Sequence, residues 1–171
     1  DVCSSDLDAI EVCEVGIPNL GHWRPIDGPY EKKSRVKNVK LDAFSLRTND
    51  IVLSIKGSVG RVGILGDTAL LDKSLVCSQS CIVLRASTQS IRPISLFLYL
   101  SSKDFREQLE ALKVGAAVSH VSPGALLKEI LVPVSALDNI AGQTDIYSEL
   151  CSIESELDQL QRRMNDLTDR L

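Results

Sequence analysis

Few residues of this chain have the types and spacing that catalysis or metal binding requires. Cys77 and Cys81 are four residues apart, but no second cysteine or histidine pair lies near them, which argues against a zinc site. Ser58 stands in the order Gly-Ser-Val-Gly, which differs from the Gly-x-Ser-x-Gly of a nucleophile elbow. Asp72 and Lys73 alone are too little for a nuclease site. We therefore expect no catalytic residues, no bound metal and no cofactor.

The charged residues are segregated along the chain, which points to a binding function instead. The net charge of the 171 residues is −4. Residues 22–64 nevertheless hold nine basic and four acidic residues, whereas residues 138–171 hold eight acidic and three basic residues. This segregation favours one face that binds a polyanion and another that stays away from it. The simpler alternative is that residues 32–40 form an ordinary solvated loop.

A DNA interface needs cationic or hydroxyl side chains for phosphates and hydrogen-bonding side chains for base edges. Gln79 suits an adenine edge, although a bond to a neighbouring backbone group would explain it equally well. His120 could face DNA or make a structural contact, and Trp23 could belong to the core. The predicted DNA-contacting residues are His22, Arg24, Lys32, Lys33, Arg35, Lys56, Ser58, Arg61, Gln79 and His120.

Hydrophobic periodicity and turn residues predict the elements that carry these side chains. Residues 22–47 are expected to form a long irregular loop with most of the basic charge, and residues 51–65 a hairpin around a glycine-containing turn. The other expected elements are strands at 10–15, 75–84 (interrupted at 78–80) and 129–134, and helices opening at Pro93, at 103–113 and at 124–128. The fold class is therefore α/β (α+β), a mixed, mostly antiparallel, twisted sheet with a few short helices.

The C-terminal segment predicts one long coiled-coil helix that begins near Asp138. Its apolar residues recur at alternating steps of four and three, which is a heptad pattern. A stripe this narrow suits pairing with another helix, although it could also pack on its own domain. We expect a domain at residues 1–135, a dimerisation and spacer helix at residues 136–171, and an antiparallel homodimer. The stripe, called the seam below, comprises Ile146, Leu150, Ile153, Leu157, Leu160, Met164, Leu167 and Leu171.

Five segments, in order, resemble motifs of type I restriction-modification specificity subunits. Residues 51–63, Ile-Val-Leu-Ser-Ile-Lys-Gly-Ser-Val-Gly-Arg-Val-Gly, are similar to a strand–turn–strand motif of that family. The other four are Cys77-Ser-Gln-Ser-Cys-Ile-Val-Leu84, residues 93–101, Gly115-Ala-Ala-Val-Ser-His-Val-Ser122 and Leu126-Leu-Lys-Glu-Ile-Leu-Val-Pro133. The resemblance runs from about residue 10 to residue 171.

The resemblance implies that residues 1–135 are a target recognition domain, an α/β module that reads half of a bipartite double-stranded DNA sequence. It also implies two partners. One is a methyltransferase subunit or domain that methylates adenine with S-adenosylmethionine, and the other is a restriction subunit that cleaves DNA. The chain looks like half of a specificity subunit, or like the recognition module of a methyltransferase–specificity fusion, and is non-catalytic by this resemblance.

Two other functions remain open from the residues alone. The chain could be a coiled-coil scaffold whose α/β head binds another protein, or an enzyme fragment whose site is completed by residues outside it. The basic segment with its aromatic residues favours DNA binding. The five cysteines, the acidic N-terminal residues and the absence of a long apolar run predict a cytoplasmic protein with no membrane partner.

Overall fold

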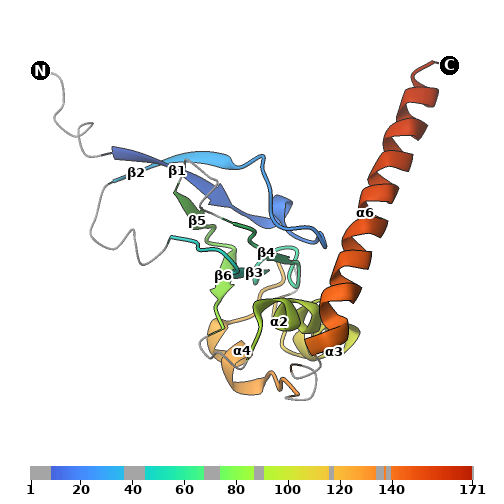
Figure 1. The fold of residues 1–171 in the computed structure, drawn as a ribbon. Coiled ribbons are helices and arrows are strands. Elements are labelled where there is room, and N and C mark those ends of the chain that lie inside the picture. The colour runs from blue at the N-terminus through green and yellow to red at the C-terminus, as the bar shows by residue number, and fades with distance from the viewer. Residues whose placement is uncertain are drawn as a thin grey trace, which may run out of the picture.

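The structure of the chain is a computed structural model that describes residues 9–36, 45–67, 74–86, 91–115, 118–133, 137 and 140–170. Within these residues it has two three-stranded sheets, a group of short helices and one long C-terminal helix (Figure 1). The expected α/β class with mostly antiparallel pairing is confirmed. The predicted domain boundary between residues 135 and 136 lies outside the described residues.

The first sheet has the strand order β2-β1-β5. β1 (Ala9–Val15), which confirms the strand predicted at 10–15, pairs antiparallel with β2 (Glu31–Val36) and parallel with β5 (Leu75–Cys77). A short 3₁₀ helix, η2 (Ile17–Asn19), follows β1. The irregular loop predicted across 22–47 is wrong, because β2 lies inside it. β2 is a polar edge strand that pairs through its backbone, so hydrophobic alternation could not reveal it.

The second sheet has the strand order β4-β3-β6. β3 (Ile51–Ser54) and β4 (Val62–Ile64) form the predicted antiparallel hairpin, and β6 (Cys81–Leu84) pairs antiparallel with the other edge of β3. The single interrupted strand predicted at 75–84 is wrong. It is two strands, β5 and β6, which belong to different sheets because the turn at 78–80 leads the chain from one sheet to the other.

β3 is buried on both faces, and the two hydrophobic cores meet there. Ile51 and Leu53 pack in one core with Phe97, whereas Val52 packs in the other core with Val15. All four residues of β3 are buried. This double burial explains why the strand reads as a continuous apolar run rather than as an alternating pattern.

Three short helices contribute side chains to the first of these cores: α2 (Pro93–Leu100), α3 (Lys103–Ala111) and α4 (Pro123–Glu129). They confirm the helices predicted in these regions. α4 begins as the sequence indicates, since Ser122 accepts a hydrogen bond from the N–H of Ala125 (3.1 Å) and Pro123 follows it. The helices therefore cover one face of the second sheet.

The strand predicted at 129–134 is wrong over the residues that the structure describes. Glu129 ends α4, and residues 130–133 form no strand. The backbone N–H of Leu131 donates to Gln108 Oε1 (2.9 Å), and its carbonyl accepts a hydrogen bond from the hydroxyl of Tyr99 (2.7 Å). Side chains of α2 and α3 thus satisfy the backbone groups that a neighbouring strand would otherwise have satisfied.

The C-terminal helix α6 (Ile140–Thr168) has 29 residues and confirms the predicted long helix. At 1.5 Å per residue its length is about 44 Å. Figure 1 shows α6 starting beside α2 and extending clear of the sheets at its C-terminal end. The rings of Tyr147 on α6 and Phe97 on α2 meet edge to face with their centroids 5.9 Å apart, which seats the first half of α6 on the domain.

Gly63→Ala tests the tight packing of β4. A Cβ atom at Gly63 would lie 2.9 Å from side-chain atoms of Ile26 and Leu20, so we expect the free energy of unfolding to fall by about 1–3 kcal/mol. Gly142→Ala on α6 is the control, because nothing lies within 4 Å of its added Cβ, and it should stabilise by about 0.5–1 kcal/mol. Urea unfolding of both variants measures this difference, and equal effects would contradict the packing described for β4.

Candidate functional site

Three turns that are far apart in the sequence meet at one end of the second sheet. The segment after β3 bonds to the turn between β5 and β6, because the N–H of Ile55 donates to the carbonyl of Ser80 (2.8 Å). The same segment bonds to the strand-like residues before α4, because the N–H of Gly57 donates to the carbonyl of Ser119 (3.0 Å). We call the four exposed polar side chains on these turns the turn cluster: Lys56, Ser58, Gln79 and His120.

The side chains of the turn cluster are available to a ligand. All four residues are exposed, and within the described part of the chain none of them has an ion pair or a side-chain hydrogen bond. The cluster offers a cation, a hydroxyl, an amide and an imidazole on adjoining turns. The sequence analysis selected all four residues, but it did not predict that they would lie together, because they come from three separate segments.

A buried serine and two glycines shape the turn that carries Ser58. The hydroxyl of Ser54, which has no exposed surface, donates to the carbonyl of Ser58 (2.6 Å) and accepts from the N–H of Arg61 (2.9 Å). Gly57 and Gly60 have φ angles of +72° and +93°, which residues with a side chain rarely adopt. The sequence analysis missed Ser54, although a polar residue inside an otherwise apolar strand was the available signal.

The other predicted DNA-contacting residues do not join the turn cluster. Lys32 and Lys33 lie on β2, with their ammonium groups 3.3 Å from Glu11 and 2.8 Å from Glu31. Arg35, also on β2, pairs through its backbone with Ile10, toward the far end of β1. These cations therefore belong to an edge of the first sheet, at a distance from the turns of the second sheet.

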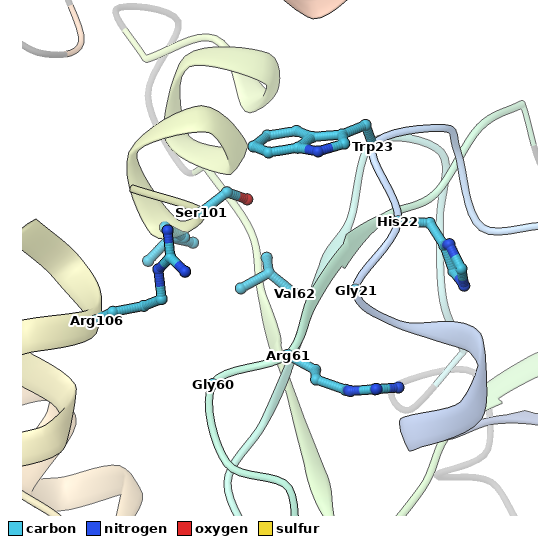
Figure 2. A pocket seen from close by; sticks show the side chains of 9 residues that line it. Gly21, His22, Trp23, Gly60, Arg61, Val62, Ser101 and Arg106 are labelled. Carbon is cyan, nitrogen blue, oxygen red and sulfur yellow. The ribbon is translucent and has the colours of Figure 1, made fainter. Parts of the chain in front are cut away.

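Arg61 lies beside a cavity of about 290 Å³ between the 21–23 segment, the end of the β3–β4 turn and the helices α2 and α3. Figure 2 shows Arg61 and Arg106 on opposite sides of this cavity. Arg61 Nη1 donates to the carbonyl of Leu20 (3.5 Å), and Arg106 Nε donates to the carbonyl of Ser102 (3.2 Å). The sequence analysis did not select Arg106, because a single basic residue on the polar face of a helix carries no signal.

His22 and Arg24 contact α6 while their side chains stay partly exposed. His22 Nδ1 lies 2.9 Å from Glu154 Oε1, and Arg24 Nη1 donates to Asp158 Oδ2 (2.6 Å). The hydrogen bond to Asp158 raises the pKa of Arg24 above its ordinary value. Trp23 lies between them with its ring edge to face on Phe97 at 5.9 Å, in agreement with the alternative that it contributes to the core. We call these contacts of residues 22–24 with Glu154 and Asp158 the helix anchor.

The seam lies on a different side of α6 from the helix anchor. Ile146, Ile153, Leu157, Leu160, Met164 and Leu167 are between 47% and 61% exposed, and Leu150 is partly buried. Leu171 lies outside the described residues. At 100° per residue the seam is turned by roughly 110° from the face that carries Tyr147, Glu154 and Asp158. The alternative that the stripe packs on its own domain is therefore not what the structure shows.

The cysteines form no metal site in the described residues. Cys13, Cys77, Cys81 and Cys151 are free thiols, and the described residues hold no group of three or more histidine, cysteine or acidic side chains that could bind a metal ion. A hydrogen bond to Cys81, together with burial, raises the pKa of Cys77. Asp72 and Lys73 lie outside the described residues. Among the helices that the structure describes, none has the length and apolar character needed to cross a membrane.

Comparisons with known proteins agree with this geometry. No curated protein matches the chain. Two solved structures share its fold: the S subunit of a type I restriction-modification system from M. genitalium (22% identity over 88% of this chain, TM-score 0.52) and the HsdS subunit from Thermoanaerobacter tengcongensis (14% identity over 97%, TM-score 0.54). The chain spans 33% and 41% of the length of these two subunits.

A family model assigns the chain directly. The model described as the type I restriction modification DNA specificity domain matches residues 15–168, which include β3, the turn cluster and all of α6. The match covers both structural parts, the α/β head and the helix. The chain therefore belongs to the family of type I restriction-modification DNA specificity domains.

Proposed function

We propose that this chain reads one half of a split double-stranded DNA sequence for a type I, or related, restriction-modification system. In this proposal it has no catalysis and no cofactor of its own. It directs a partner that methylates adenine at N6 with S-adenosylmethionine, and an associated endonuclease, to the site, all within the cytoplasm. The observation that carries the proposal is the turn cluster, four unpaired polar side chains held on a buried scaffold in a family of DNA specificity domains.

The chemistry of the turn cluster suits a DNA groove. Gln79 can form two hydrogen bonds with an adenine edge, and His120 can bond to a neighbouring base. Lys56, Ser58 and the backbone at the glycine turn suit phosphate oxygens. Arg61 lies next to this turn and extends the cationic surface. The proposal assigns these residues to the reading surface and assigns His22 and Arg24 to the helix anchor.

The cations on β2 are proposed to bind the DNA backbone and not to read bases. Lys32, Lys33 and Arg35 would contact phosphates flanking the half-site. Exposed ion pairs such as Lys32 with Glu11 are worth about 0–1 kcal/mol, so a DNA phosphate can replace the carboxylate at little cost. With so few cations, non-specific binding by the chain alone is expected to be weak, with a Kd on the order of 10⁻⁴ to 10⁻⁶ M, until the methyltransferase partner assembles with it.

The exposed seam supports a second part of the proposal, an antiparallel homodimer. Six apolar side chains, each about half exposed, form a narrow stripe on α6 that no described part of the domain covers. Two such stripes would bury each other in a coiled coil and place one head at each end. A dimer of this kind would read a palindromic split site.

Lys56→Ala and Gln79→Ala test the reading surface. Lys56→Ala should weaken binding to all duplexes alike and lower the log–log salt slope by about one unit, because one phosphate contact is lost. Gln79→Ala should weaken the binding free energy by about 1–3 kcal/mol for the recognised sequence and leave binding to other duplexes unchanged. Fluorescence anisotropy on a random duplex and on the cognate duplex, found by methylome sequencing with and without the gene, measures both effects. Arg162→Ala on α6 is the control that removes the same charge as Lys56→Ala. An equal loss of DNA affinity in that variant would contradict the assignment of Lys56 to the reading surface.

Replacing Leu157 and Leu160 by Asp tests the seam. Four carboxylates would enter each dimer interface, so sedimentation at tens of micromolar should show a monomer instead of a dimer. The matched control is Ser155→Asp with Gln159→Asp, two exposed positions outside the seam, which should leave the dimer intact. A wild-type monomer, or a dimer that survives in the Leu157/Leu160 variant, contradicts the proposed seam.

A further inference from the structure

Glu154 is the most heavily hydrogen-bonded side chain on α6. Its Oε2 accepts from the backbone N–H groups of Trp23 and Arg24, each at 3.0 Å, and its Oε1 lies 2.9 Å from His22 Nδ1. The Glu154 side chain is only 14% exposed. A carboxylate that meets three donors from one segment holds that segment in a defined orientation, because each bond requires a particular direction.

The segment that meets Glu154 is itself fixed to the second sheet. The N–H of Gly21 donates to the carbonyl of Val62 (2.8 Å), and the N–H of Ile26 donates to the carbonyl of Ile64 (2.8 Å). Both acceptors lie on β4, the hairpin partner of β3. Residues 22–24 therefore form a bridge between two bonds to the sheet, and Glu154 connects α6 through this bridge to the strands that carry the turn cluster.

α6 rests on the domain at two places along its length. The first is near its start, where Gln143 accepts a hydrogen bond from the hydroxyl of Ser95 and Tyr147 packs on Phe97. The second is the helix anchor at Glu154 and Asp158. Gln143 in the first support and Glu154 in the second are eleven residues apart, or about 16 Å along the helix axis. A rod held at one place can pivot, whereas a rod held at two places has a fixed tilt.

We propose that Glu154 is a positioning residue that fixes the tilt of α6 against the head and thereby sets the spacing between the two DNA half-sites. This inference rests on the proposed function, since a spacing exists only if two heads read one DNA. From Glu154 to Thr168 the helix extends about 21 Å. A change in tilt of about 10° would move its end by about 4 Å, which is roughly the rise of one base pair. A change in the contacts of Glu154 could therefore alter the distance between the two heads by about one base pair.

Three variants on α6 test the inference in the 171-residue chain assembled with its methyltransferase partner. Glu154→Ala removes the three Glu154 contacts to residues 22–24 and leaves the Arg24–Asp158 pair, whereas Glu154→Gln keeps an acceptor oxygen for the two backbone N–H groups. Glu156→Ala is the matched control, because Glu156 is exposed and has no partner among the described residues. Amide hydrogen exchange at residues 22–24 reports the anchor. Selection from a pool of duplexes with a random centre of about 40 base pairs, followed by sequencing, reports the half-sites and the spacer.

The expected result separates tilt from recognition. Glu154→Ala should speed exchange at Trp23 and Arg24 more than tenfold and shift or broaden the preferred spacer by about one base pair, with unchanged half-site sequences. Glu154→Gln should keep exchange rates and a spacer preference close to those of the wild type, and Glu156→Ala should match the wild type in both. A wild-type spacer preference in Glu154→Ala, or the same shift in Glu156→Ala, overturns the inference.

Two further outcomes are informative. If Glu154→Ala does not fold, Glu154→Asp takes its place, since its carboxylate is one methylene shorter and cannot keep all three contacts, and an unchanged spacer in that variant overturns the inference. If the wild-type chain, assembled with its methyltransferase partner, selects a single half-site or none, the proposed function fails and the inference falls with it. A selected pair of half-sites with an insensitive spacer refutes only the role of Glu154.

Discussion

The burial of β3 between two hydrophobic cores is the constraint on which the rest of the structure depends. Ile51 and Leu53 face one core and Val52 faces the other, so a slip by one residue would misplace apolar side chains in both. The C-terminal end of β3 leads directly to Lys56, and its partner β4 carries the bonds that hold residues 21–26. The turn cluster and the support for α6 are therefore both attached to one strand pair, β3 and β4.

The charges of the chain serve two different purposes in this arrangement. Part of the basic segment is neutralised within the molecule, as in the pairs of Arg24 with Asp158 and Lys32 with Glu11. The turn cluster, by contrast, has no acidic partner among the described residues. A positive net charge in a sequence window therefore overstates the cationic surface that a polyanion would meet, and the geometry of a few unpaired side chains matters more.

α6 combines two interactions on separate faces of one helix. One face presents Tyr147, Glu154 and Asp158 to the domain, and the seam is left exposed. The first face uses directional polar contacts, which define an orientation. The second uses apolar area, which drives association without specifying an angle. Separate faces allow a head to be oriented by its own helix while that helix pairs with another.

The sequence by itself determined the elements whose residues repeat in a pattern of burial. The β3–β4 hairpin, the helices at 93–100 and 123–129 with their prolines, and the heptad stripe of α6 all follow from local periodicity and capping. It also supplied the residues of the turn cluster as separate candidates, since polar side chains in segments with turn residues can be selected without a structure.

Only the tertiary structure decided how polar segments pair. β2 joins its sheet through backbone hydrogen bonds, Leu131 is bonded by side chains of α2 and α3, and the strands β5 and β6 separate into two sheets. Glu154 meets residues that lie more than 120 positions earlier in the chain. Such contacts leave no periodic trace, because a backbone amide or a carboxylate can pair with many partners and the packed cores select which one.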